Sequence, residues 1–106
     1  MDEGEKRTAH RALVDSVLRG KGAAATDLRA RAFHNEKLPA PLFTVIDKVA
    51  SRPTEISDQD FETAKSAGFS EDQLFELVIS AAVGQSSRMY ERGLAALAEA
   101  GGEEVR

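Results

Sequence analysis

Residues 57–77 read SDQDFETAKSAGFSEDQLFEL, and this stretch decides the fold. Ser57 can cap a helix, with an aspartate three residues later in the position of a capping-box partner. Gly68 suits the left-handed conformation that ends many helices. Ser70 and Gln73 form a second capping box, so a new helix begins just after the glycine. The stretch therefore predicts two helices that meet at a tight corner, with Gly68 at positive φ.

Helical periodicity continues on both sides of this corner, and no stretch shows the period-two alternation of a strand. Glycine and proline residues separate the apolar runs and set the expected helix ends. We therefore predict an all-α single domain of about five helices over residues 1–106, with a frayed tail after Ala100. The expected helices are Glu5–Arg19, a short helix capped by Thr26, Leu42–Ser51, Asp58–Ala67, Glu71–Val83 and its continuation Met89–Ala100.

The first expected helix is amphipathic. Its apolar residues Ala9, Ala12, Leu13 and Val17, with Leu18 beside them, recur at spacings of three and four, which indicates the face that turns toward the core. His10 then falls on the polar side of this helix. We expect its ring to be solvated.

The segment Glu71–Val83 is apolar on most of its sides, which predicts the central buried helix of the domain. We expect Phe75, Val78 and Ile79 to be its most sensitive core positions. Replacing Phe75 or Ile79 by alanine is expected to cost about 2–5 kcal/mol. Small residues around Gly84 would let another helix approach this segment closely.

The composition is that of an ordinary globular protein, with 42% hydrophobic and 30% charged residues. No run approaches the roughly 18 apolar residues of a membrane span, so we expect no membrane partner. The charged amino-terminal residues lack the apolar core of a signal peptide, which makes the cytoplasm the expected location. The net charge is −4 and no basic stripe alternates with aromatic residues, so we expect no nucleic-acid partner.

The corner motif and the segment after it resemble the carboxymuconolactone decarboxylase and alkylhydroperoxidase D-like (AhpD-like) family. The resemblance covers roughly residues 40–100 and rests on the acidic start 58–61, the motif AGFSEDQ at 67–73 and the alanine-rich helix that follows. It implies an AhpD-like helical fold that assembles from helical hairpins. In the redox members of that family, a Cys-x-x-Cys-x-x-x-His motif carries the chemistry.

The chain contains no cysteine, so it departs from the redox branch at the reactive residues. One alignment puts Pro53, Ile56 and Asp60 where the two cysteines and the histidine would stand, and another puts the motif within Leu13–Ala50. Both placements lack the thiolate that makes such a site reactive. We therefore expect no thiol peroxidase activity from this chain, no catalytic residue of that kind and no cofactor.

His10 and His34 are the only histidines, and neither has the His-x-x-x-His or Glu-x-x-His spacing of a metal site. The sequence favours solvated or helix-terminal histidines and no metal. The decarboxylase branch relies on a histidine and carboxylates, so it stays open. The run Gly20-Lys21-Gly22 has no preceding strand and no hydroxyl residue after the lysine, so we interpret it as a helix stop and not as a phosphate loop.

A polar cluster on the continuation of the buried helix is the candidate site. Peroxidase-related AhpD-like proteins often carry Asn-Arg near here, followed by Gly-Leu, and this chain has Ser-Arg at 87–88 and Gly-Leu at 93–94. The sequence favours an ion-pair role at a subunit interface over anion binding. The candidate interface or anion-binding residues are Arg88, Tyr90, Arg92, Ala82 and Ser86.

We expect a non-catalytic AhpD-like protein that acts through association, either as a homo-oligomer or with a cysteine-containing relative. A core of this modest size gains from an interface, and small residues permit close helix contact. Two alternatives stay open. One is a small-molecule enzyme of decarboxylase type with His10 or His34 as the acid–base group, and the other is a helical ligand-binding module.

Overall fold

The computed structural model describes the backbone of residues 3–105 and the side-chain burial of residues 4–101. The described chain is all-α, as predicted, with five α-helices, a single 3₁₀ turn and no strand within residues 3–105. The elements are α1 (Glu3–Arg19), α2 (Thr26–His34), α3 (Leu42–Ser51), η1 (Pro53–Glu55), α4 (Asp58–Ser66) and α5 (Glu71–Val105).

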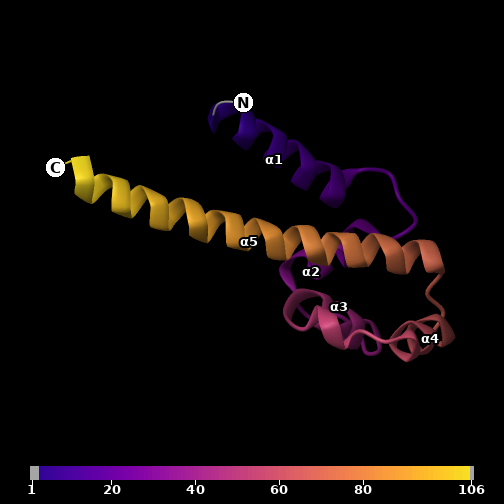
Figure 1. The fold of residues 1–106 in the computed structure, drawn as a ribbon. Helices are drawn as coiled ribbons and strands as arrows, with labels where there is room; N and C mark the ends of the chain where they lie inside the picture. Colours follow the sequence, from indigo (N-terminus) through magenta and orange to yellow (C-terminus); the bar gives the residue numbers. More distant parts are fainter. Residues whose placement is uncertain (1–2, 106) are drawn as a thin grey trace.

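The 35-residue helix α5 runs through the whole molecule and packs against each of the other four helices. In Figure 1, α1 lies on one side of α5, whereas α2, α3 and α4 lie together on the other side. The C-terminal part of α5 projects beyond these helices, which gives the molecule an elongated shape of 58 × 28 × 22 Å. The central position predicted for this helix is confirmed.

The corner between α4 and α5 forms as the sequence predicts. The Ser57 backbone N–H donates to the Asp60 carboxylate over 3.0 Å, and the reciprocal bond to the Ser57 side chain completes a capping box. Ser70 and Gln73 make the second box through bonds of 2.8 and 3.1 Å. Gly68 has φ = +106°, a backbone conformation that residues with a Cβ rarely adopt.

The core lies between the N-terminal half of α5 and the helices α2, α3 and α4. Helix α3 turns the predicted face toward it, because Leu42, Val45 and Ile46 have no exposed surface. Phe61, Phe69 and Val78 are half-buried against the same cluster. The buried apolar residues are Ala24, Ala32, Leu38, Leu42, Val45, Ile46, Ala64, Leu74, Leu77 and Ala81.

Helix α5 is buried on one face only, so the prediction that Phe75 and Ile79 belong to the core is wrong. Phe75 is 65% exposed and Ile79 is 38% exposed, whereas Leu77 is fully buried. A segment that is apolar on most sides does not itself specify which side meets the other helices. Gly84 determines which side of α5 faces α2, because an added Cβ would lie only 1.8 Å from the Phe33 carbonyl oxygen at the end of α2. Only the glycine face of α5 can approach α2 that closely.

The predicted buried face of α1 is wrong at three of its residues and right at two. Ala9, Ala12 and Leu13 are exposed, and no side chain between residues 4 and 19 is fully buried. Val17 and Leu18 of the predicted set are half-buried, and the half-buried face continues through Val14 to His10. This face includes His10 because its ring packs on Tyr90, with ring centroids 4.6 Å apart. Helical spacing alone fits more than one face of α1. The contact between His10 and Tyr90, which are far apart in the sequence, determines which face is turned toward α5.

Two helix ends also differ from the prediction. Thr26 is the first residue of α2 and not its cap, since Ala25 occupies the cap position without a side-chain hydrogen bond. The tail expected to fray after Ala100 continues as helix to Val105. Alanine-rich sequence favours helix strongly enough to carry α5 through the two glycines at 101–102.

Candidate functional site

The five predicted site residues lie on α5, and the structure divides them between two surfaces. Arg88, Tyr90 and Arg92 line a cavity of about 560 Å³. Ala82 and Ser86 are exposed on a different side of the helix. The sequence grouped these residues by their position in the chain, whereas the turn of the helix separates them.

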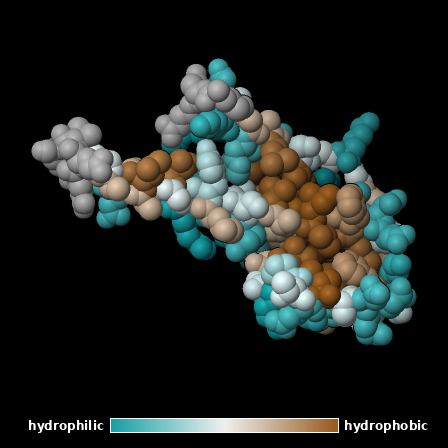
Figure 2. All heavy atoms as spheres, viewed as in Figure 1, coloured by the Kyte–Doolittle hydropathy of each residue, from teal (hydrophilic) through white to brown (hydrophobic). Residues whose placement is uncertain are grey.

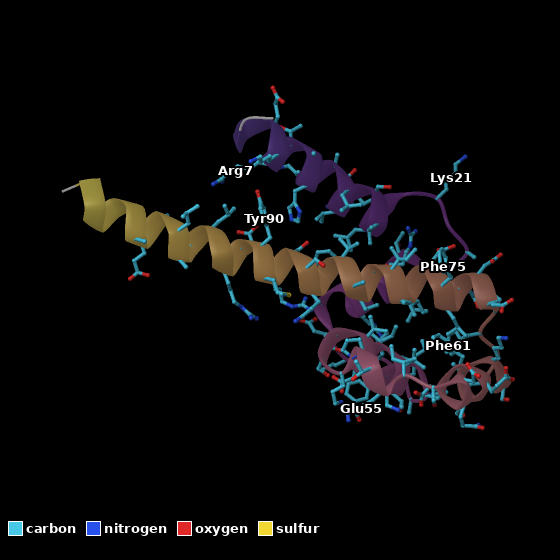
Figure 3. The ribbon with its side chains drawn as sticks, in the orientation of Figure 1. Arg7, Lys21, Glu55, Phe61, Phe75 and Tyr90 are labelled. Atoms are coloured by element: carbon cyan, nitrogen blue, oxygen red, sulfur yellow. The ribbon has the colours of Figure 1, made fainter. Side chains whose placement is uncertain are left out.

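The cavity, called the arginine cavity below, lies where α1, the end of α2 and α5 meet. Figure 3 shows Arg7 on α1 and Tyr90 on α5 extending into the space between these two helices. Glu91 is the single acidic residue among those that line it. The basic residues of its lining are Arg7, His10, Arg11, His34, Arg88 and Arg92.

Arg88 is held at the cavity wall by two acceptors. Its guanidinium donates to the Phe33 carbonyl oxygen over 2.7 Å and to the Gln85 side-chain oxygen over 3.0 Å. Phe33 lies in the last turn of α2, where carbonyl groups lack helical partners and carry the negative end of the helix dipole. The arginine therefore caps α2 from a neighbouring helix, and its remaining N–H groups are not used in these bonds.

Ser87 also lines the cavity. The residue is only 7% exposed, and its hydroxyl has no hydrogen-bond partner. A buried hydroxyl without a partner costs free energy that a hydrogen bond would restore. This serine belongs to the Ser-Arg pair noted at 87–88, but nothing in the sequence indicated that its hydroxyl is buried.

Both histidines line this same cavity, which the sequence analysis did not anticipate. His10 comes from α1 and contacts Tyr90, as described above. His34 ends α2, as predicted, and its ring meets Phe33 edge-on at 5.0 Å. The two residues are far apart in the chain, so no local spacing could reveal that they share a site.

One exposed side of α5 forms a stripe along nearly the whole helix. Its members recur at spacings of four and three, which keeps them on one side of an α-helix. None of them is charged, and Phe75, Met89 and Leu97 are each at least 60% exposed. Figure 2 shows apolar residues gathered over the N-terminal half of α5 and again on its projecting part. This α5 stripe consists of Phe75, Ile79, Ala82, Ser86, Met89, Gly93, Leu97 and Ala100.

A second polar arrangement holds the loop between α1 and α2 in place, and the sequence analysis missed it. The Glu76 carboxylate accepts hydrogen bonds from the backbone N–H groups of Ala23 and Ala24 over 2.7 and 2.9 Å. The bonds from Ala24 and Ala23 lower the pKa of Glu76, and the positive charge of Arg29 lowers it further. Gly22 permits this contact, because a Cβ there would lie 2.3 Å from a carboxylate oxygen.

The buried Arg29 side chain holds the same loop through two further hydrogen bonds. It is only 5% exposed and donates to the carbonyl oxygens of Ala24 and Val17 over 3.1 and 3.2 Å. These bonds tie α2 to the loop and to the last turn of α1. An arginine in a short amphipathic helix is ordinarily expected on the surface, so the sequence pattern gave no indication of its burial.

On the far side of the core, Lys48 on α3 pairs with Asp60 on α4 over 3.0 Å. The bond from the Ser57 backbone and the Lys48 ammonium lower the pKa of Asp60. The two side chains are 19% and 12% exposed. The pair therefore joins α3 to the start of α4.

Among the side chains that the structure describes, those of residues 4–101, no group of three or more histidine, cysteine, aspartate or glutamate residues is arranged to hold a metal ion. No helix in the described part of the chain has the length and apolar character needed to span a membrane. No protein-family model, curated protein or solved structure matches this chain. The resemblance to AhpD-like proteins therefore stays a prediction.

Proposed function

We propose that this chain acts through association, as a homodimer that forms when the α5 stripes of two copies pack together. The chain has no cysteine, so it performs no thiol peroxidase chemistry itself. The observation that carries the proposal is the uncharged, exposed α5 stripe, which continues from the body of the protein onto the projecting part of α5. From Phe75 to Leu97 the stripe extends for about 33 Å at about 1.5 Å per residue.

The projecting part of α5 is a second reason for a partner. Residues 95–100 are all exposed, although four of them are alanine and one is Leu97. Isolated helices shorter than about 12–15 residues are marginal in water, and most helical stability in proteins comes from packing of an apolar face. A second copy would supply the packing that the projecting helix lacks within one chain.

The order of residues along the stripe suits an antiparallel dimer centred on Ser86. Phe75 and Leu97 lie equally far along the chain on either side of Ser86, and so do Ile79 and Gly93. In a two-fold interface each of these residues would face the other member of its pair from the partner. Ile79 would meet the open space at Gly93, and the small Ala82 and Ser86 would let the helices approach closely at the axis.

The association test is Ala82→Glu, which places a charge in the middle of the α5 stripe. We expect the wild-type protein to sediment as a dimer at about 100 μM, and the variant to sediment as a monomer. Ala95→Glu is the matched control, because Ala95 is exposed on the opposite side of the same helix. A wild-type protein that is monomeric at this concentration contradicts self-association.

Engineered cysteines test the antiparallel register, and the natural chain has no thiol to interfere. Ser86→Cys should form a disulfide-linked dimer on mild oxidation, because the two-fold axis brings this position close to its own copy. Leu97→Cys alone should not cross-link, whereas a mixture of Leu97→Cys and Phe75→Cys proteins should. Efficient cross-linking of Leu97→Cys to itself contradicts the antiparallel register.

The stripe would equally accept a cysteine-containing relative with a similar helix. Copurification with mass analysis separates the two forms of association, because the dimer gives one mass and the hetero-oligomer gives two. A relative that is retained by wild-type protein and lost from Ala82→Glu would assign the stripe to a hetero-oligomer.

The arginine cavity favours a second candidate function, that of a ligand-binding module or a small-molecule enzyme of decarboxylase type. The supporting observation is that His10 and His34 line one cavity of metabolite size. If either histidine acts as an acid–base group, His10→Gln or His34→Gln should remove turnover while leaving the fold intact. A monomeric wild-type protein would make this candidate the preferred one.

A further inference from the structure

We infer that the arginine cavity binds a small phosphate monoester whose organic part is apolar or carries a ring. This inference concerns a different side of α5 from the stripe and does not depend on association. Its basis is the charge, the donors and the apolar lining that the three helices bring together.

The charge of the cavity demands an anion with more than one negative charge. Three of the lining arginines are enough for this, Arg11 from α1 and Arg88 and Arg92 from α5, because Glu91 is the only carboxylate among the lining residues. Like charges gathered around one cavity repel each other, and a bound anion relieves that repulsion. A phosphate monoester carries a charge of about −1.5 to −2 near neutral pH, more than a single carboxylate supplies.

The cavity also presents donors that are already positioned. The two acceptors of Arg88 fix its guanidinium at the wall, so little side-chain freedom is lost when the remaining N–H groups bind an oxyanion. Arginine guanidinium groups match phosphate oxygens with two parallel hydrogen bonds. This arrangement favours an anion with several acceptor oxygens in one group.

The Ser87 hydroxyl is the independent observation that points to a ligand. Ser87 is more than nine-tenths buried and lines the cavity, and its hydroxyl has no hydrogen-bond partner among the residues that the structure describes. The hydroxyl oxygen is itself buried, so a rotation of the Ser87 side chain would be needed to bring it to a phosphate oxygen in the cavity. That bond would remove the cost of burying an unpaired hydroxyl. The adjacent Arg88 would bind the same group, because both residues come from one turn of α5.

The apolar part of the lining indicates the rest of the ligand. Val14, Phe33 and Leu94 contribute apolar surface, and the His10 and Tyr90 rings lie together at the side of α5 that faces α1. Inorganic phosphate would fill only a small part of about 560 Å³. A ring or short chain attached to the phosphate would bury this surface and add affinity.

The test uses three probes that separate the contributions: phenyl phosphate, inorganic phosphate and benzoate. Titration calorimetry should show phenyl phosphate binding with a Kd below about 1 mM, and each of the other two binding at least about tenfold more weakly. Amide shifts in NMR spectra should concentrate at α1, the end of α2 and residues 85–94. Equal affinity for benzoate contradicts a phosphate site, and equal affinity for inorganic phosphate contradicts a site for an organic ester.

Two variants and one control locate the site. Ser87→Ala removes the unpaired hydroxyl with little change in shape, and Arg92→Gln removes one positive charge. Each should weaken phenyl phosphate binding by about fivefold to twentyfold, since a hydrogen bond to a charged group contributes about 1–2 kcal/mol. Arg31→Gln, at an exposed arginine of α2 outside the cavity lining, should leave binding unchanged. No binding by wild-type protein at about 5 mM phenyl phosphate, or unaltered binding by both variants, overturns the inference.

Discussion

The two faces of α5 have similar composition but opposite environments. One face places Leu74, Leu77 and Ala81 in the core, and the other leaves Phe75 and Ile79 in contact with solvent. The largest of these side chains, Phe75, therefore lies outside, and so does Ile79, which is as large as the buried leucines. The close approach of the α5 backbone to the end of α2 therefore determines which face of α5 is buried, and the size of its apolar residues does not.

The largest expected effect contrasts Leu77→Ala with Phe75→Ala. Leu77 is fully buried, so its truncation leaves a cavity and should lower the free energy of unfolding by about 2–5 kcal/mol. Phe75 is the larger residue, but its exposed position should limit the change to about 0.5 kcal/mol. Urea denaturation in the Ala82→Glu background would measure both without a contribution from association.

Equal losses in the two variants would show that the two faces do not differ as described. A loss at Phe75 that appears only in the wild-type background would instead sharpen the comparison. It would place Phe75 in the dimer interface and not in the core of one chain.

Much of the fold could be predicted because its signals are local. The capping boxes at Ser57 and Ser70 and the positive φ of Gly68 depend on residues within a few positions of each other. The rotation of α5 and the buried face of α1 depend on contacts between distant residues, such as His10 with Tyr90. Helical spacing alone left two faces equivalent in each case.

The candidate site also combines residues that are close in the sequence with residues that are far apart. Arg88, Tyr90 and Arg92 are neighbours in the chain, so a sequence could group them. The contributions of α1 and α2 to the arginine cavity arise only from the packing of three helices. Gly84 was the one signal in the sequence for that packing. A glycine makes a helix less stable, so its presence is explained where another backbone needs the space of a side chain.

The second prediction therefore concerns Gly84. An alanine there would push its Cβ into the Phe33 carbonyl group, a backbone atom that cannot rotate away. We expect Gly84→Ala to destabilise the protein by about 1–3 kcal/mol, although alanine is the better helix former. Thermal and urea denaturation would measure the change.

Gly93→Ala in the Ala82→Glu background is the matched control, since nothing lies within 4 Å of the Cβ it would add. That variant should be more stable by about 0.5–1 kcal/mol. If both glycines respond alike, the close approach of α5 to α2 does not determine which face is buried.

The third prediction tests Glu76, which lies beside the buried face and fixes the loop before α2. Glu76→Gln weakens two charge-assisted hydrogen bonds and should cost about 1–2 kcal/mol at pH 7. The pKa of Glu76 is lowered in the folded protein, so its stabilisation is fully present above the unfolded value. It is lost as the pH falls below 4.5, the ordinary value of a glutamate, toward the folded value.

The wild-type protein should therefore lose stability below about pH 4.5 more steeply than Glu76→Gln does. Glu99→Gln, at an exposed glutamate on the same helix, should retain the wild-type slope. Parallel slopes for all three proteins would show that the loop does not depend on the charge of Glu76. Asp60 contributes a slope of the same sign in each protein, because its pKa is also lowered, so it does not affect the comparison.

The smallest expected effect is at Gly68, which sets the direction in which α5 leaves α4 and thus which face of α5 meets the core. Its φ of +106° disfavours any residue with a Cβ, yet nothing lies within 4 Å of the position that a Cβ would take. Gly68→Ala therefore isolates backbone strain from steric contact. We expect a loss of about 1 kcal/mol in urea denaturation, because the strain exceeds the gain from a less flexible unfolded chain. A variant as stable as the wild type would mean that the corner relaxes without cost, and the two faces of α5 would then owe their difference to Gly84 alone.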